Sequence, residues 1–417
     1  MVVTQAQAPP ADTRRVSAAV AAAGLSSFAL LYAPQPVLPQ LAGAFRLDPG
    51  SASLAVGVAT TALAVTVLPL AWLAGVAGRR RVILWSVLGS AVIGLLLPLA
   101  PSFPVLLAMR AVQGVAVAGF AGVAAAYLAD RLGTARLPGA VGAMIAGNTM
   151  GGMLGRLGAG FAAGPLGWHG ALFAVASVAL LCALFTALAL PRDRHPSPAR
   201  TPRHPQAPRP GRATTAPPHR QVAASAPQRE GPGRPVAAYA VGALGMGAFV
   251  ALYNAAGFRL SAPPISLSTA AASLVFLAYA MGTASSAAAG RMAARLGRTP
   301  ALVTALTVTV AGAVMTASPA LPFVALGFAV LTAGFFAAHA IANAWVTADA
   351  EPSARGRAAG MYTLAYYLGS GVGGTAGGVV YGHAGWTWLV VLTSAWLLLA
   401  GLAVLVSRAG RRRRAGP

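Results

Sequence analysis

Long apolar runs alternate along the whole chain with short segments rich in arginine. A helix needs about 20 mostly apolar residues to cross the hydrocarbon of a bilayer. Twelve runs approach this length: Ser17–Leu38, Leu54–Ala77, Val82–Ala100, Pro104–Tyr127, Pro138–Ala162, His169–Leu190, Val236–Phe258, Ala270–Met292, Pro300–Ala317, Leu321–Trp345, Ala358–Tyr381 and Thr387–Ser407. Only helices satisfy their own backbone polar groups at this length in hydrocarbon, so we predict an all-α membrane protein with twelve transmembrane helices.

A polar segment, Pro191 to Pro235, separates the first six runs from the last six. It contains 12 proline and 9 arginine residues, and Val222 is its only aliphatic residue apart from alanine and proline. Such a segment cannot bury enough apolar surface to offset the entropy cost of ordering it. We therefore expect a disordered linker at 191–235 between two bundles at 17–190 and 236–407, with tails at 1–16 and 408–417.

Short motifs recur in the two halves at a nearly constant spacing. Offsets of 219, 222 and 218 residues relate Gly78-Arg79 to Gly297-Arg298, Gly151-Gly152 to Gly373-Gly374, and Gly167-Trp168 to Gly385-Trp386. Near-constant offsets predict two equivalent six-helix bundles that cross the membrane in the same direction, related by a parallel repeat. We expect a pathway between the two bundles.

Glycines also recur every four residues within single runs. The clearest sets are Gly147, Gly151 and Gly155, and Gly369, Gly373 and Gly377. Small residues at this spacing let helix backbones approach closely in a membrane. The faces they form serve either plain packing or the sliding of one helix on another.

Charge and composition favour a membrane location. The chain of 417 residues is 57% hydrophobic and only 9% charged, whereas soluble domains carry about 25% charged residues. A formal net charge of +23 would suit nucleic acid, but the arginines lie in loops and tails between apolar runs, so we expect no nucleic-acid partner. Of 30 arginines, 26 fall on one side of the predicted topology, which places both termini and the linker in the cytoplasm. We expect a monomeric, multi-pass plasma (inner) membrane protein whose arginines contact anionic lipid headgroups.

Several motifs resemble those of the major facilitator superfamily. Leu73–Arg81 and Gly290–Arg298 are similar to the family's loop motif, and Arg110-Ala111-Val112-Gln113-Gly114 is similar to a motif of its drug/proton antiporter branch. Gly147–Arg156, Gly334–His339 and Tyr366–Gly371 resemble the bacterial YnfM-like inner-membrane transport proteins. The resemblance implies the major facilitator fold and alternating access.

The same resemblance implies a cytoplasmic gate. Its expected members are Gly78, Arg79, Asp130, Gly297, Arg298 and Asp349. The aspartate of the family's loop motif, which helps to latch that gate, is replaced here by Gly75 and Ala294. Asp130 and Asp349 are then the nearest acidic side chains that could take its place.

Polar side chains within the apolar runs are costly in hydrocarbon and are therefore candidates for a transport pathway. None of the seven acidic residues lies in a run. Arg110 and Arg156 do, and they either extend to the outer surface or face a wet cavity that favours anionic or electron-rich groups. His339 lies in the middle of a run, as either a proton carrier or a hydrogen-bonded core residue. The other candidates are Tyr32, Gln35, Gln113, Asn148, Tyr253, Asn254, Asn343, Tyr366 and Tyr367.

These features predict a secondary active transporter that exports small apolar or amphipathic compounds in exchange for protons. Uptake or facilitated diffusion of a metabolite is an alternative, because the runs contain no carboxylate. A polytopic sensor or membrane enzyme is a third reading, although the chain shows neither a soluble sensory domain nor a polar catalytic cluster. No metal-ligand cluster, nucleophile motif or phosphate loop stands out. We therefore expect a small-molecule substrate, no cofactor, no metal, no catalytic residue and no enzymatic activity.

Overall fold

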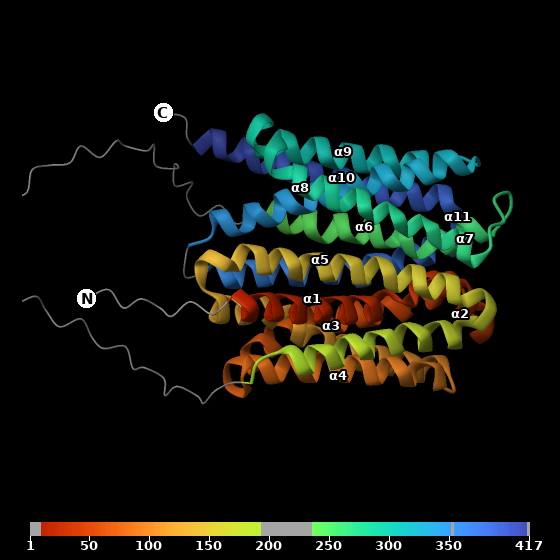
Figure 1. Cartoon of the computed structure of the whole chain (residues 1–417). Coiled ribbons are helices and arrows are strands. Elements are labelled where there is room, and N and C mark those ends of the chain that lie inside the picture. The colour runs from red at the N-terminus through yellow and green to blue at the C-terminus, as the bar shows by residue number, and fades with distance from the viewer. Residues whose placement is uncertain (1–9, 193–235, 352–353, 415–417) are drawn as a thin grey trace, which may run out of the picture.

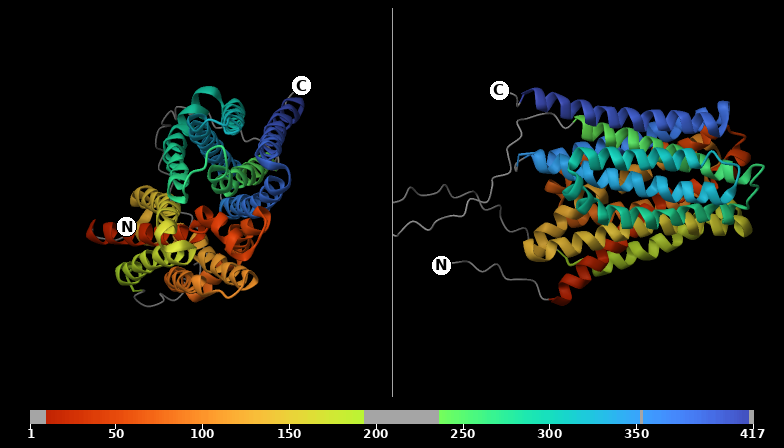
Figure 2. Two further views of the ribbon diagram at one scale, coloured as in Figure 1. Left: turned by 90° about the vertical axis from the view of Figure 1, so that its right-hand side faces the viewer. Right: turned by 90° about the horizontal axis from the view of Figure 1, so that it is seen from above.

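The protein is a bundle of long helices that run along one common axis (Figure 1; Figure 2). The computed structural model describes residues 10–192, 236–351 and 354–414, and these residues form helices and turns with no strand among them. The elements are α1 (Pro10–Tyr32), η1 (Gln35–Val37), α2 (Leu38–Phe45), α3 (Pro49–Ala77), α4 (Arg79–Leu96), η2 (Leu97–Leu99), α5 (Phe103–Ala189), α6 (Val236–Ser261), α7 (Thr269–Ser273), η3 (Leu274–Ala278), α8 (Tyr279–Leu296), α9 (Arg298–Met315), α10 (Leu321–Asp349) and α11 (Arg355–Arg414). The start of α1 and the end of α11 lie at the same end of the bundle, which we call the terminal face; the opposite end is the distal face.

Ten of the described helical segments are long and apolar enough to span a membrane, which agrees with an all-α membrane fold. Two of the ten, Arg136–Ala189 and Arg355–Ala409, contain 54 and 55 residues. At about 1.5 Å per residue each would extend about 80 Å, far beyond the ~30 Å of bilayer hydrocarbon. Each contains a glycine with positive φ, Gly167 at 63° and Gly385 at 79°. The structure therefore gives ten segments, and the count of twelve crossings stays a prediction.

Both long elements turn back within the bundle. Figure 1 shows the colours of α5 and α11 passing along the bundle axis and returning. Glycine tolerates a positive φ because it has no Cβ, and at Gly385 the backbone leaves helical geometry altogether. A reversal at Gly167 and at Gly385 would give one further crossing in each half, as the sequence predicts.

The turns at the terminal face show the repeat in local geometry. A single glycine joins α3 to α4 and another joins α8 to α9, namely Gly78 with φ 93° and Gly297 with φ 82°. Each of the two glycines adopts a positive φ, which would be strained for a residue with a Cβ, and each is followed directly by arginine. The same turn chemistry therefore recurs at the spacing that the sequence shows.

The glycine seams show the repeat in helix packing. A Cβ added to Gly151 would lie 2.3 Å from the backbone oxygen of Leu25, and one added to Gly373 would lie 2.4 Å from Cα of Gly247. The full seams pair Gly147, Gly151 and Gly155 with Ala21, Leu25 and Ala29, and Gly369, Gly373 and Gly377 with Ala243, Gly247 and Ala251. Every member of the second seam stands 222 residues after its counterpart. The two seams therefore pack α1 on α5 and α6 on α11 in the same register.

The described helices pack in two groups. In the N-terminal half α1, α3 and α4 pack on α5, and in the C-terminal half α6 packs on α11 while α8 and α9 pack on α10. The groups meet where α3 lies along α11 and where α5 contacts α7. The expected domain boundaries stay predictions, and most of the predicted linker lies outside the described residues.

Candidate functional site

A cavity of about 500 Å³ lies between the two halves, lined by α1 and α5 from one side and by α6, α8, α10 and α11 from the other. Seven of the residues expected in the pathway line it: Tyr32, Asn148, Arg156, His339, Asn343, Tyr366 and Tyr367. No acidic residue is among the described residues that line it. We call this space the central cavity. Its walls combine aromatic rings with a few polar groups, as in most small-molecule sites.

The other five candidates, Gln35, Arg110, Gln113, Tyr253 and Asn254, lie outside the cavity wall.

The central cavity is closed toward the distal face. There the start of α3 packs directly on α11, and a Cβ added to Gly378 would lie 2.6 Å from Oγ of Ser53. On the other side of the cavity, a Cβ added to Gly160 of α5 would lie 2.2 Å from Cβ of Ser273 in α7. These contacts leave no room for a solute to pass between the halves at this end.

The same cavity is open toward the terminal face. Its lining residues Ile145 on α5 and Asn343 on α10 are exposed, Ile145 by 55%. Near Ile145, a Cβ added to Gly139 or Gly142 would meet nothing within 4 Å. The two halves therefore separate at the terminal face and touch at the distal face.

Arg156 of α5 supplies the positive charge of the cavity wall. Its side chain is 1% exposed, its Nε donates to Oε1 of Gln35 at 2.5 Å and its Nη1 donates to the carbonyl of Gly152 at 2.8 Å. The guanidinium carbon lies 4.0 Å from the ring centre of Tyr32 and 4.5 Å from that of Tyr279. The flat guanidinium thus lies between aromatic faces, an arrangement that stabilises a cation where water is scarce.

Gln35 and Asn254 connect the two halves on the distal side of Arg156. Gln35 lies in η1, directly after the break that Pro34 makes in α1, and its Nε2 donates to Oδ1 of Asn254 on α6 at 2.7 Å. Both side chains are buried. Arg156, Gln35 and Asn254 therefore form one polar chain that crosses from the N-terminal to the C-terminal half.

His339 of α10 faces the central cavity from the C-terminal half. Its Nδ1 and the hydroxyl oxygen of Tyr362 share a hydrogen bond of 2.9 Å, and its ring centre lies 4.6 Å from that of Tyr366. The side chain is half-buried, so it contacts both the aromatic wall and the open cavity. Among the described residues no group of three His, Cys, Asp or Glu could hold a metal ion.

The sequence and fold of the chain match known transport proteins. The family model of the Major Facilitator Superfamily matches residues 20–261 and 235–417, which is most of the chain. The chain belongs to the Major Facilitator Superfamily. This confirms the resemblance seen in the motifs.

Two curated relatives support the same assignment. The chain is 35% identical over 386 residues to the inner membrane transport protein YnfM of Escherichia coli (strain K12), covering 93% of this chain and 88% of the relative. It is 33% identical over 387 residues to the uncharacterized MFS-type transporter YybF of Bacillus subtilis (strain 168), covering 93% and 92%. The chain is therefore a multi-pass membrane transporter and not an enzyme.

Solved structures share the fold at low sequence identity. A bacterial homolog of the human lysosomal transporter Spinster superposes with a TM-score of 0.71 at 16% identity, covering 95% of this chain and 96% of that chain. The nucleoside transporter NupG superposes with a TM-score of 0.67 at 15% identity, covering 94% and 98%. These two likenesses show the superfamily fold.

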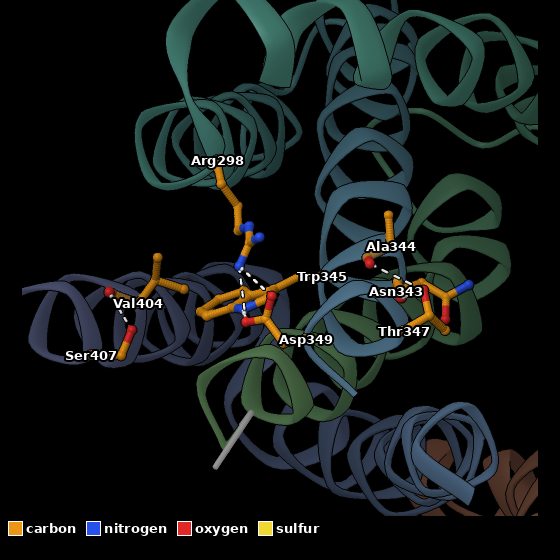
Figure 3. A network of polar contacts seen from close by, with 8 residues as sticks. All are labelled: Arg298, Asn343, Ala344, Trp345, Thr347, Asp349, Val404 and Ser407. Carbon is orange, nitrogen blue, oxygen red and sulfur yellow. Dashed lines mark hydrogen bonds and ion pairs between the residues drawn. The ribbon is translucent and has the colours of Figure 1, made fainter. Parts of the chain in front are cut away.

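The residues of the expected gate form two ion pairs at the terminal face. Arg79 of α4 pairs with Asp130 of α5. Arg298 of α9 pairs with Asp349 of α10 at 3.0 Å, and Nε1 of Trp345 donates to the same carboxylate at 2.6 Å (Figure 3). Each pair joins two helices of one half, so in this conformation neither pair ties the two halves together. Their role in gating stays a prediction.

Arg110 of the antiporter-like motif is placed inside the N-terminal half rather than in the cavity wall. Its Nη1 donates to the carbonyl of Leu30 at 3.0 Å and its Nη2 donates to that of Leu31 at 2.5 Å. The fourth residue after Leu30 is Pro34, which has no N–H to give that carbonyl a helical partner. Arg110 therefore satisfies a backbone group that the break in α1 leaves unpaired.

Two other expected pathway residues also pack within one half. Gln113 accepts from Arg110 and donates its Nε2 to the carbonyl of Ser90 at 2.9 Å. Tyr253 is buried, and its hydroxyl shares a hydrogen bond of 2.7 Å with Oγ1 of Thr332. These contacts join helices of the same half and leave neither side chain in the cavity wall.

The cavity wall also contains aromatic residues that the sequence reasoning missed: Phe249, Tyr279, Phe336 and Tyr362. A tyrosine within an apolar run carries a weak signal, because its hydroxyl needs a partner in hydrocarbon. That signal could have found Tyr279 and Tyr362. The phenylalanines carry no such signal, because an apolar ring is as stable against lipid as in a cavity wall.

Proposed function

We propose that the chain is a secondary active transporter that works by alternating access and exports small apolar or amphipathic compounds in exchange for protons. The observation that carries the proposal is the central cavity, which is enclosed between two repeated halves, open at one face and closed at the other. A transporter must expose one site to each side of the membrane in turn, and repeated halves can rock about such a site.

The cavity wall suits an amphipathic solute. Its volume of about 500 Å³ lies within the range of ~300–1,000 Å³ typical of small-molecule sites. Phe249, Phe336 and Tyr366 offer apolar ring faces, while Asn148 and Asn343 offer amide groups. A compound with an apolar body and one polar end could satisfy both kinds of wall.

His339 is the residue to which we assign proton exchange. An imidazole gains and loses a proton near neutral pH, and no described residue that lines the cavity is an acid. In the conformation open to the terminal face, His339 reaches the cavity, where water can supply or remove the proton. Closure around the cavity would remove that water and disfavour the charged imidazolium.

The test is pH-driven transport by the purified full chain in proteoliposomes. His339→Gln should abolish accumulation driven by an imposed pH gradient and preserve downhill counterflow of the same solute. His383→Gln is the matched control, because His383 lies on α11 outside the cavity and bonds only the carbonyl of Val379 within its own helix. Unchanged pH-driven accumulation in His339→Gln would reject His339 as the proton carrier.

Uptake or facilitated diffusion without proton coupling is the second candidate function. The absence of an acidic side chain among the described lining residues favours it, because many proton-coupled carriers rely on a membrane carboxylate. Equal transport by the wild-type protein with and without a pH gradient would support this candidate and reject proton exchange.

A further inference from the structure

Arg156 carries a buried charge that the protein itself does not neutralise. Arg156 as a whole residue is 1% exposed, and the acceptors of its hydrogen bonds, Oε1 of Gln35 and the carbonyl of Gly152, are both neutral. None of the described residues that line the central cavity is an aspartate or glutamate. A lone charge in such a position is costly, and rings such as those of Tyr32 and Tyr279 offset only part of the cost.

Arg156 also has hydrogen-bond donors to spare. A guanidinium presents five N–H groups in a planar fork, and the described chain provides acceptors for two of them. The side chain belongs to the cavity wall, so the remaining donors can reach a molecule in the cavity. A planar fork of this kind matches the two oxygens of a carboxylate.

We propose that the central cavity holds an anionic substrate, an amphipathic monocarboxylate, with the carboxylate on Arg156 and the apolar body against Phe249, Phe336 and Tyr366. This proposal rests on the proposed transport function and names its substrate class. A single negative charge would neutralise the one arginine of the wall. A dianion would leave one charge unpaired in the same buried place, so a monoanion fits better.

The arrangement along the cavity supports the orientation of that substrate. Arg156 lies toward the closed distal side, next to the bridge formed by Gln35 and Asn254. Neutral polar groups of Ser286 and Asn343 line the cavity where it opens to the terminal face. The charged end would therefore enter first and lie deepest, where water is most completely excluded and the ion pair is strongest.

Three probes that share one apolar body test the proposal: 4-phenylbutanoate, its neutral amide 4-phenylbutanamide, and the cation 4-phenylbutylammonium. Binding of each to the purified full chain in detergent would be measured by calorimetry at neutral pH. We expect the carboxylate to bind at least about tenfold more tightly than the amide, the gain of one charged hydrogen-bonded pair. The ammonium probe should bind most weakly.

Substitutions then assign the preference to Arg156. Arg156→Gln should remove the preference for carboxylate over amide, whereas Arg156→Lys should retain part of it through the charge. Arg259→Gln is the matched control, because Arg259 lies on α6 outside the cavity and donates to the carbonyl of Ser318. Thermal unfolding of each variant would show whether it is folded. The preference of the wild-type protein for the carboxylate over the amide tests the proposal without any variant.

Three results would overturn the proposal. They are equal binding of carboxylate and amide by the wild-type protein, a carboxylate preference that survives in Arg156→Gln, and no binding of any of the three probes. Transport of neutral solutes without carboxylate preference would reject this inference and leave the proposed transport function intact. Carboxylate binding without transport of any solute would instead support the site and reject the transport proposal.

Discussion

The two halves share one packing plan and differ in the side chains they present to each other. The seam of α1 on α5 and the seam of α6 on α11 place glycines at positions 222 residues apart against backbones in the same register. On that register Arg156 corresponds to Gly378. The N-terminal half therefore brings a cation to the cavity at a position where the C-terminal half has a bare backbone packed on α3.

The difference extends to how each half uses polar residues. The N-terminal half buries Arg110 and Gln113 against backbone carbonyls, and the carbonyl of Leu30, which Arg110 contacts, is one that the break at Pro34 leaves unpaired. The C-terminal half surrounds the cavity with rings, including Phe249 and Phe336, and one histidine. Close packing of the helix backbones at the seams is enough to give both halves the same fold. Side chains outside the seams can therefore differ between the two halves. The polar groups of the cavity wall are among the side chains in which the two halves differ.

The largest effect is expected at Arg110, which supports the break at Pro34 in the N-terminal half. Arg110→Leu would leave the carbonyls of Leu30 and Leu31 without their donors in a buried place. Each unsatisfied group costs about 1–3 kcal/mol, so we expect a loss of about 2–6 kcal/mol in the stability of the folded protein. Thermal unfolding in detergent would measure it, with Arg259→Leu as the control. An unchanged unfolding temperature would show that these bonds do not stabilise the break in α1.

A smaller and symmetric effect is expected at the seams. Gly151→Val and Gly373→Val would each force a side chain into a backbone, because a bare Cβ already approaches within 2.3 and 2.4 Å. Overpacking of this kind costs about 1–3 kcal/mol, and the shared register predicts similar losses for both. Gly142→Val, at a position with open space, should cost far less. A large loss at one seam and none at the other would break the equivalence of the halves.

A several-fold change in labelling rate is expected at the hydrogen bond between Gln35 and Asn254, which bridges the two halves. Asn254→Leu removes the acceptor of the bond from Gln35 and should favour opening at the distal face. One neutral hydrogen bond contributes about 0.5–1.5 kcal/mol, which corresponds to a roughly two- to tenfold shift in population. Cysteine placed at Ser273, in a Cys182→Ser background, should then react faster with a membrane-impermeant thiol reagent from the distal side. Asn343→Leu, at the open end, is the control, and equal rates in both variants would reject the bridge as a latch.

The smallest effect is expected in the segment that joins the two halves along the chain. Replacing residues 198–228, which lie outside the described residues, with a Gly/Ser chain of equal length should leave transport unchanged, because the composition of this segment predicts a tether. Transport in proteoliposomes would check this, with membrane insertion measured alongside. Lost transport with normal insertion would show that the segment does more than connect the halves.

The sequence predicted the fold class and family well and the site only in part. Periodic apolar runs and recurring glycines are local signals, and they led to the helices and to the repeat. Polar residues inside runs led to Arg156 and His339, which line the cavity, but equally to Arg110 and Tyr253, which do not. A polar side chain in a membrane helix needs a partner, and both a cavity and a backbone carbonyl can supply one.

The sequence by itself determined that this chain is an all-α membrane protein built from two related halves. Long apolar runs in hydrocarbon must be helical, because only a helix hydrogen-bonds all of its own backbone groups at this length. The repeat is visible as short motifs that recur at a nearly constant spacing. Only the tertiary structure decided which polar residues meet. The bridge from Arg156 through Gln35 to Asn254 joins positions far apart in the chain, and the partners of Arg110 depend on how α1 breaks at Pro34. Which face of the cavity is open depends likewise on how the halves tilt, since the same helices can pack in more than one arrangement.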